Sequence, residues 1–251
     1  MSPYVFSIKI KSALVLPLFL SVLFAPTPSA FAADKLKILF ETREPIAYRD
    51  AQGKLTGIIA YPVMKALTKA NIAYEWVEMP FKRQIITIES NQETACALGL
   101  FKNAERMRYA KFSQAVTVEL NRPSVLLMHK EFVIDKTLDL ARVLSLPHIR
   151  LLKKEAASYG SVIDDAIERS RATQISTTAE SSNMARMIAA KRADFIFVAE
   201  DEALRLIKSI PEGDQLTIFK PLNMPQESER FMMCSKLVAD EVIARFNKAL
   251  R

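Results

Sequence analysis

Histidine and cysteine are scarce in this chain, whose 251 residues contain two of each. His129 and His148 have no second ligand at the spacing of a metal site, and Cys96 and Cys234 lack the Cys-x-x-Cys spacing of a redox motif. We therefore expect neither a metal nor another cofactor. In an oxidising compartment the two cysteines can form a disulfide. Both lie in apolar strand-like runs, where buried free cysteine is common, so the two alternatives stay open.

Large charge clusters and long apolar runs are missing from most of the chain. The formal net charge is +7, but the excess is spread among 28 acidic residues, and no aromatic-rich basic motif accompanies it. A nucleic-acid-binding role is therefore not indicated. After residue 32 no apolar stretch reaches the roughly 20 residues that a membrane-spanning helix needs, so we expect an exported, soluble mature chain.

The N-terminal segment has the three parts of a secretory signal peptide. Lys9 and Lys11 form a positive region, residues 12–24 are almost wholly apolar, and residues 30–32 (AFA) provide a cleavage site. We expect residues 1–32 to be removed and the mature protein to lie in the periplasm. A retained membrane anchor is the alternative, although the apolar core is short for a membrane span.

Strand-like and helix-like segments alternate along the rest of the chain. Strands are expected at residues 35–41, 72–77 and 94–100 and helices at 58–70 and 83–89, with a hairpin or turn at 48–57. This order predicts a parallel α/β sheet. The composition shifts after a strand at 124–129, which indicates a second unit. Further strands are expected at 149–152, 172–176, 193–199, 216–220 and 230–234, and further helices at 162–169, 179–190, 202–208 and 240–250.

Residues 98–113 (LGLFKNAERMRYAKFS) join the end of a strand to a charged turn. Arg106 lies where the buried run meets this turn, and a guanidinium there is suited to binding a carboxylate because it offers a planar fork of donors. The plainer interpretation is that Arg106 and Arg108 are solvated at the start of a helix. Phe81 and Arg83 occupy another strand-to-helix connection and are candidates for the rim of a ligand site.

Several short motifs occur in an order that resembles a known family. They are residues 45–48 (PIAY), 52–57 (QGKLTG), 79–83 (MPFKR), 104–106 (AER) followed by 112–113 (FS), 191–194 (KRAD), and 235–236 (SK) through 246–250 (FNKAL). Each motif is weak, but together they cover nearly the whole mature chain in a consistent order. The sequence resembles the family 3 extracellular solute-binding proteins, which serve polar amino-acid ABC transporters.

The resemblance implies an α/β fold of two lobes, the type II periplasmic-binding-protein fold, closing on a ligand by hinge motion. Residues 33–128 with 222–251 would form the first lobe, and residues 129–221 the second. In the amino-acid binders of this family, the arginine that matches Arg106 pairs with the ligand carboxylate. The other ligand-binding candidates are Arg83, Phe81, Glu44, Tyr48 and Phe101 in the first lobe, and Tyr159 and Glu200 in the second.

The function implied by the resemblance is capture of a small polar or carboxylate-bearing, amino-acid-like solute for an ABC transporter permease, by a monomeric protein without catalytic residues. Two alternatives use the same scaffold. One is a periplasmic enzyme similar to cyclohexadienyl dehydratases, with Glu44 or Glu200 as the acid. The other is a sensory binding module that recognises a protein partner.

Overall fold

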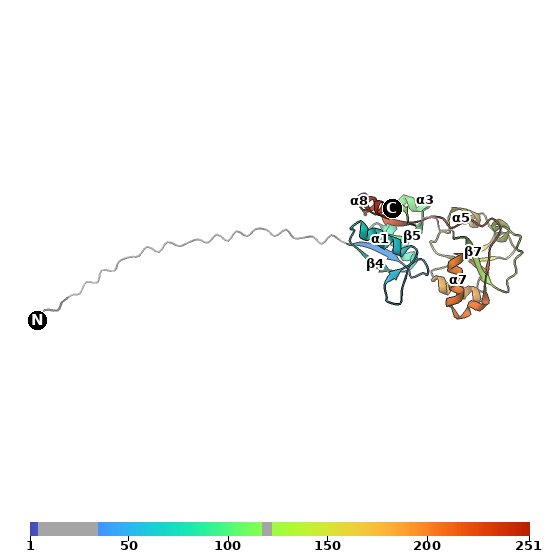
Figure 1. Cartoon of the computed structure of the whole chain (residues 1–251), viewed down its shortest axis with the longest axis horizontal. Helices are drawn as coiled ribbons and strands as arrows, with labels where there is room; N and C mark the ends of the chain where they lie inside the picture. The colour runs from blue at the N-terminus through green and yellow to red at the C-terminus, as the bar shows by residue number, and fades with distance from the viewer. Residues whose placement is uncertain (5–34, 117–121) are drawn as a thin grey trace. The chain divides into compact units, whose positions relative to one another are not determined.

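Two five-stranded sheets organise the chain from residue 33 onward. The structure is a computed structural model that describes residues 1–4, 35–116 and 122–251. The predicted signal peptide therefore lies outside the described residues, apart from its first four. Each sheet carries its own helices (Figure 1), and we call the two resulting halves the first and the second lobe. The predicted α/β fold class is confirmed.

The first lobe contains a mixed sheet with the strand order β4-β1-β5-β12-β6. Its strands are β1 (Leu36–Phe40), β4 (Tyr74–Glu78), β5 (Ala95–Phe101), β6 (Ala110–Ala115) and β12 (Arg230–Ser235). β1 pairs in parallel with β4 and β5, as the alternation of strands and helices predicts, whereas β12 runs antiparallel to both β5 and β6. The last strand of the chain therefore completes a sheet that the first strand begins.

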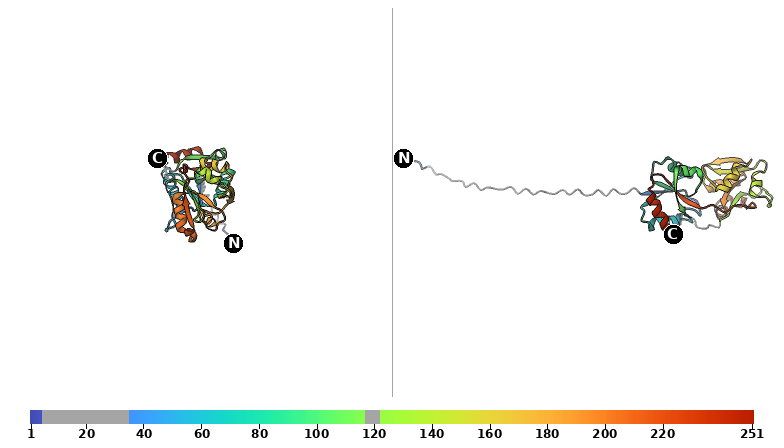
Figure 2. Two further views of the ribbon diagram at one scale, coloured as in Figure 1. Left: turned by 90° about the vertical axis from the view of Figure 1, so that its right-hand side faces the viewer. Right: turned by 90° about the horizontal axis from the view of Figure 1, so that it is seen from above.

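Four helices and a short hairpin accompany this sheet. They are α1 (Ala60–Lys69), α2 (Phe81–Ser90), α3 (Ala104–Tyr109) and α8 (Asp240–Leu250), with the hairpin of β2 (Tyr48–Arg49) and β3 (Leu55–Thr56). α1 and α8 pack against each other. Figure 2 shows α8, at the red end of the chain, with the elements of the first lobe.

The second lobe contains a sheet with the strand order β11-β7-β10-β8-β9. Its strands are β7 (Ser124–His129), β8 (Arg150–Lys154), β9 (Thr173–Thr177), β10 (Phe195–Ala199) and β11 (Leu216–Phe219). The helices are α4 (Leu140–Leu144), α5 (Ser161–Glu168), α6 (Ser181–Ala189) and α7 (Glu200–Ser209), followed by the 3-10 helix η1 (Pro211–Gln215). All of these elements come from one continuous stretch of the chain.

The chain crosses between the lobes twice, and the two crossings run side by side. Pro123 forms a bridge with Gln226, and the Glu227 amide donates to the Arg122 carbonyl at 2.9 Å. The predicted boundary at residue 128 differs from this arrangement, because β7 pairs with β10 and β11 and so belongs to the second sheet. The sequence analysis also missed β6, whose sequence (AKFSQA) has no apolar run and which is a strand because it pairs with β12.

Alternation along the strands divides each lobe into two apolar layers. In β1, Ile38 and Phe40 face one cluster and Leu39 faces the other, and in β7, Leu127 and Leu126 divide in the same way. This is the period of two expected when both faces of a sheet are covered. Each sheet is therefore held from both sides, which fixes the strand ends that approach the other lobe.

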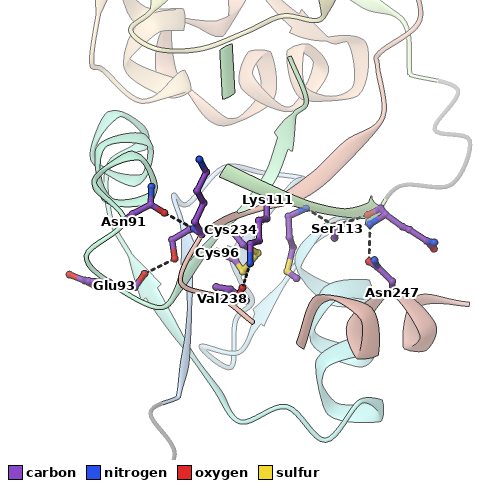
Figure 3. The surroundings of a disulfide bond; sticks show 12 residues. Asn91, Glu93, Cys96, Lys111, Ser113, Cys234, Val238 and Asn247 are labelled. Atoms are coloured by element: carbon purple, nitrogen blue, oxygen red, sulfur yellow. Dashed lines mark hydrogen bonds between the residues drawn. A yellow bond between two sulfur atoms is a disulfide. The ribbon is translucent and has the colours of Figure 1, made fainter. Parts of the chain in front are cut away.

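A disulfide joins Cys96 of β5 to Cys234 of β12 (Figure 3). The two residues face each other across the antiparallel pair, and 138 residues separate them in sequence. Of the two alternatives left by the sequence, the structure has the disulfide. Hydrogen bonds reinforce the same region: the Ser235 hydroxyl donates to the Glu93 carbonyl at 2.6 Å, and the Lys111 ammonium donates to the Val238 carbonyl at 2.9 Å.

Candidate functional site

A cavity of about 70 Å³ lies between the two lobes, at the ends of β5 and β10. Its walls are mainly apolar, with charged side chains at several positions. First-lobe and crossing residues that line it are Arg43, Phe81, Gly99, Leu100, Phe101, Arg106, Glu227 and Arg230. Second-lobe residues that line it are Ser124, Lys154, Ala157, Ser158, Tyr159, Ile163, Ser181, Met184, Ile196, Phe197, Val198 and Ala199.

Arg106 reaches this cavity from α3. The helix begins after Asn103, whose side chain accepts a hydrogen bond from the Arg106 amide at 2.9 Å and so caps the helix. The guanidinium is buried, with 4% of the residue exposed, and it donates to the carbonyls of Phe101 at 2.7 Å and of Ala156 at 2.9 Å. Burial lowers the pKa of Arg106, although arginine stays protonated in proteins. A buried cation therefore spans the two lobes at the cavity wall.

A β-bulge in β5 shapes the wall beside Arg106. Leu98 and Gly99 together oppose a single residue of β12, and Gly99 has a positive φ of 68°, which glycine adopts without strain. Leu100 and Phe101, which follow the bulge, both line the cavity. The Gly99 carbonyl accepts a hydrogen bond from Arg230 Nη1 at 2.8 Å, and the Arg230 guanidinium lies 4.3 Å from the centre of the Phe101 ring.

Arg43 and Glu202 form an ion pair that joins the lobes beside the cavity. Arg43 Nε donates to Glu202 Oε1 at 2.7 Å, and Nη2 donates to Oε2 at 2.6 Å. Glu202 is fully buried. Burial by itself would raise the pKa of Glu202, but the Arg43 charge and hydrogen bonds outweigh it and hold that pKa below its ordinary value. Both oxygens of this carboxylate are therefore committed to one arginine.

Glu41 and Lys154 make a second ion pair between the lobes. Glu41 comes directly after β1, and Lys154 ends β8, so both are placed by strand ends. The other Glu41 oxygen accepts the Phe81 amide at 3.2 Å, and the Lys154 ammonium lies 5.6 Å from the centre of the Phe81 ring. Burial lowers the pKa of Lys154 despite the attraction of Glu41.

A buried network connects the two crossing segments. Arg122 Nη1 donates to Glu227 Oε2 at 2.5 Å, while Glu227 Oε1 accepts from Arg230 Nε at 3.0 Å. Arg122 also binds Asp201 at the start of α7, with Nη2 2.6 Å from Oδ1. This network ties the hinge region, defined here as residues 122–123 and 226–230, to the second lobe.

Tyr159 lines the cavity from the loop before α5. Its hydroxyl oxygen accepts a hydrogen bond from the Lys154 amide at 3.0 Å, and its ring lies 5.7 Å from the ring of Phe197. Burial raises the pKa of Tyr159 to about 12. The phenol is therefore protonated at neutral pH and still has its own hydrogen to donate.

Four of the eight ligand-binding candidates predicted from the sequence line the cavity, namely Arg106, Phe81, Phe101 and Tyr159. The other four lie elsewhere. Glu44 is exposed and forms an ion pair with Arg205 at 3.5 Å. Tyr48 pairs with Thr56 in the β2–β3 hairpin, and Arg83 is exposed on α2. Glu200 begins α7, and because successive helical residues point in different directions, Glu202 rather than Glu200 is the buried acid of that helix.

Several charged residues of the site were not expected from the sequence. Glu41 and Arg43 follow β1 and Lys154 ends β8, so the rule that ligand sites lie at the carboxyl ends of strands could have found them. Arg230 and Glu227 carry no such signal, because they depend on the return of β12 to the first sheet. No group of acidic, histidine and cysteine side chains among the described residues is arranged to hold a metal ion. Within residues 35–116 and 122–251, every helix is too short or too polar to span a bilayer.

Comparison with known proteins gives one family match and many similar structures. The family model of bacterial extracellular solute-binding proteins, family 3, matches residues 36–205, which is more than half of the chain. The substrate-binding protein of an amino acid ABC transporter is 14% identical with a TM-score of 0.67, over 86% of this chain and 91% of the other. A search of curated proteins found no significant match.

Two further solved structures have the same fold. The arginine-, lysine-, histidine-binding protein ArtJ from Geobacillus stearothermophilus is 16% identical with a TM-score of 0.64, over 86% of this chain and 87% of the other. The ancestral amino acid-binding protein AncCDT-1, a precursor of cyclohexadienyl dehydratase, is 13% identical with a TM-score of 0.63, over 86% and 87% of the two chains. These similarities establish the two-lobed fold.

Proposed function

The chain belongs to the bacterial extracellular solute-binding proteins of family 3, and on this premise we propose that it captures a small carboxylate-bearing solute between its lobes for an ABC transporter. The amino-acid-binding proteins among the similar structures support this proposal. Arg106 is the residue that would hold the carboxylate. The cavity between the lobes is where the solute would bind.

One observation carries the proposal, namely the imbalance of charge around the cavity. Four cationic side chains line it: Arg43, Arg106, Lys154 and Arg230. Arg43, Lys154 and Arg230 each form an ion pair with a glutamate. Arg106 donates to two backbone carbonyls and forms no ion pair with a carboxylate of the described residues. A buried cation with no carboxylate within ion-pair distance favours an anionic ligand.

Replacement of Arg106 by Ala tests this role. Removing one partner of a buried, hydrogen-bonded charge pair costs about 2–5 kcal/mol, so Kd for a carboxylate ligand should rise by at least about 30-fold. The matched control is Arg108→Ala, which removes the same charge from an exposed position of the same helix. Isothermal titration calorimetry against a library of small carboxylates measures both. Equal affinity in the two variants would contradict the role of Arg106.

Closure of the lobes on the ligand is part of the same proposal. Family members with this fold close by hinge motion, and the side-by-side crossing segments provide the hinge. Small-angle scattering should show a smaller radius of gyration when a carboxylate that raises the melting temperature is added. A radius that stays constant at saturating ligand would contradict closure.

The remaining parts of the proposal concern catalysis, location and assembly. A dehydratase would need an acid beside Arg106. Neither Glu44 nor Glu200 lines the cavity, and Glu227, which does, is paired with Arg122 and Arg230, which supports binding without turnover. Turnover of a prephenate-like substrate that disappears in the variant Glu200→Gln would instead favour an enzyme.

We further propose a periplasmic monomer that docks on a transporter permease. Fractionation of the periplasm and light scattering of the purified chain test location and oligomeric state.

A further inference from the structure

Each acid near the cavity is already paired with a cation of the protein. Three glutamates lie at the cavity or next to the side chains that line it: Glu41, Glu202 and Glu227. Arg43 occupies both oxygens of Glu202, and Arg122 and Arg230 occupy one oxygen each of Glu227. The Phe81 amide and the Lys154 ammonium occupy the two oxygens of Glu41. All six carboxylate oxygens therefore accept at least one hydrogen bond from the protein.

An ammonium group would find no unpaired charge at this site. A glutamate that bound one would share its charge with a second cation and weaken its ion pair with a buried arginine or lysine; complete loss of such a partner costs about 3–5 kcal/mol. Asp164, in the first turn of α5 after Tyr159, accepts from the Tyr159 amide at 2.8 Å and from the Ser158 hydroxyl at 2.5 Å. Its two oxygens are thus also engaged.

The donors, in contrast, are available. Arg106 has no carboxylate partner among the described residues, and Tyr159 accepts through its oxygen while retaining a hydrogen to donate. The Ser124 hydroxyl lines the cavity and forms no hydrogen bond with another described residue. A hydroxyl can donate to a ligand oxygen, but as a neutral group it cannot balance an ammonium charge. The cavity therefore favours a ligand rich in acceptors.

Size and wall chemistry narrow the ligand further. A cavity needs a volume of about 10–15 Å³ to hold one water molecule. The cavity of about 70 Å³ therefore has room for roughly five to seven groups, each about as large as a water molecule. The aromatic and aliphatic wall includes Phe81, Phe101, Phe197 and Met184. A short apolar chain fits beside them better than a long charged side chain does.

We propose that the ligand is a small monocarboxylate with a hydroxyl or oxo group in place of the α-amino group, that is, a 2-hydroxy or 2-oxo acid of about three to five carbons. This inference rests on the proposed function and names its ligand class. Arg106 binds the carboxylate. The hydroxyls of Tyr159 and Ser124 donate hydrogen bonds to the hydroxyl or oxo oxygen of the ligand. Arg43 sets the preference over amino acids by neutralising Glu202. The amino acid of the same carbon skeleton binds more weakly because every glutamate near the cavity is already paired with a cation.

Isosteric pairs of ligands test the proposal directly. L-Lactate and L-alanine differ only in the hydroxyl and ammonium groups, as do (S)-2-hydroxy-3-methylbutanoate and L-valine. The mature chain is unfolded and refolded to remove co-purified ligand and is then titrated with both pairs and with pyruvate. We expect at least one hydroxy or oxo acid to bind at least 10-fold more tightly than its amino acid, and Arg106→Ala to abolish that binding.

The possible outcomes separate this inference from the proposed function. If an amino acid binds as tightly as its hydroxy acid or more tightly, and binding depends on Arg106, the ligand class is wrong and the proposed function stands. If none of the five compounds changes the melting temperature or gives heat on titration, the ligand class is overturned. If in addition no compound of the carboxylate library binds, the proposed function is overturned as well.

The variant Arg43→Gln locates the cause of the preference. It leaves the Glu202 carboxylate without its cation, so the ratio of affinities should shift toward the amino acid by 10-fold or more. Arg43→Lys, which keeps the charge, is the matched control and should retain the wild-type preference. Circular dichroism verifies that both variants fold. An unchanged ratio in folded Arg43→Gln would overturn the role given to Arg43, while the wild-type ratio continues to decide the ligand class.

Discussion

The two lobes have sheets of equal strand number but are assembled from the chain in different ways. The first sheet takes β1, β4, β5 and β6 from one part of the sequence and β12 from the far end, whereas the second takes its five strands from residues 124–219. The disulfide lies in the first sheet, between β5 and the returning β12. The entropic cost of bringing two chain segments together rises with the number of residues between them. The disulfide therefore joins the strand pair whose formation costs much chain entropy. The second lobe, which contains no cysteine, is held by its apolar layers and by ion pairs such as Arg150–Asp194, without a covalent cross-link.

The largest expected loss of stability comes from a substitution that disrupts the apolar packing of the second lobe. Phe195 in β10 is fully buried, and its ring lies 5.3 Å from the ring of Phe197. Phe195→Ala leaves a cavity and should lower the free energy of unfolding by about 3–5 kcal/mol, measured by urea denaturation. The control is Val133→Ala, in the same lobe at a residue that is 89% exposed. A loss below about 1 kcal/mol for Phe195→Ala would contradict the assigned core position.

The next largest loss of stability comes from removing the disulfide of the first lobe. The double variant Cys96→Ala, Cys234→Ala should lose about 2–5 kcal/mol of stability, because the unfolded chain is no longer constrained. Hydrogen exchange should quicken in β5 and β12 more than in β7 and β10. The wild-type protein under reducing conditions should behave in the same way. Equal acceleration in both sheets would show that the disulfide does not act mainly on the first lobe.

The third effect concerns the ion pair of Arg43 and Glu202, whose arginine side chain is 27% exposed and so keeps part of its hydration when Glu202 is replaced. The pKa of Glu202 is held below 4.5 in the folded chain, so its contribution to stability is complete above about pH 4.5 and is lost as pH falls through the folded pKa. Glu202→Gln should lower stability at pH 7 and flatten the dependence on pH below about 5. Thermal denaturation between pH 3 and 7 measures both. A variant whose pH profile parallels the wild type would refute this contribution.

The smallest effect sharpens the contrast between buried and exposed contacts of the two lobes. Lys82 and Glu155 also pair across the lobes, but their side chains are 49% and 35% exposed. Such pairs contribute about 0–1 kcal/mol, and salt screens them. Lys82→Gln should therefore change stability by less than 1 kcal/mol, an effect that vanishes at high salt. A loss as large as that of Glu202→Gln would contradict this ranking.

Part of this arrangement could be predicted from the sequence because it depends on local pattern. Strands such as β1 and β10 are short apolar runs, and helices such as α1 and α6 have apolar residues at helical spacing, so their positions were recognisable. β6 was missed because its charged, partly exposed sequence becomes a strand only beside β12. Tertiary pairing overrides weak local preference in such edge strands.

The candidate site shows the same division. The predicted ligand-binding residues Arg106, Phe81, Phe101 and Tyr159 lie at strand ends or in the connections that follow them, and all four line the cavity. Their role in binding stays a prediction. The choice of Glu200 over Glu202 failed, because three consecutive acids look alike until the orientation of α7 shows which one is buried. Glu44 and Arg83 failed for a similar reason, since a residue near a strand end can still face solvent.

By itself, the sequence determined the alternation of strands and helices and the motif order that resembles the family, and it left open whether Arg106 is buried or solvated. Only the tertiary structure decided which charged residues form ion pairs and whether the two cysteines form a disulfide. Whether Cys96 reaches Cys234, and whether Arg43 reaches Glu202, depends on segments more than a hundred residues apart. The physical reason is that patterns of polarity act through neighbouring residues, whereas the partner of a buried charge is set by how the lobes pack.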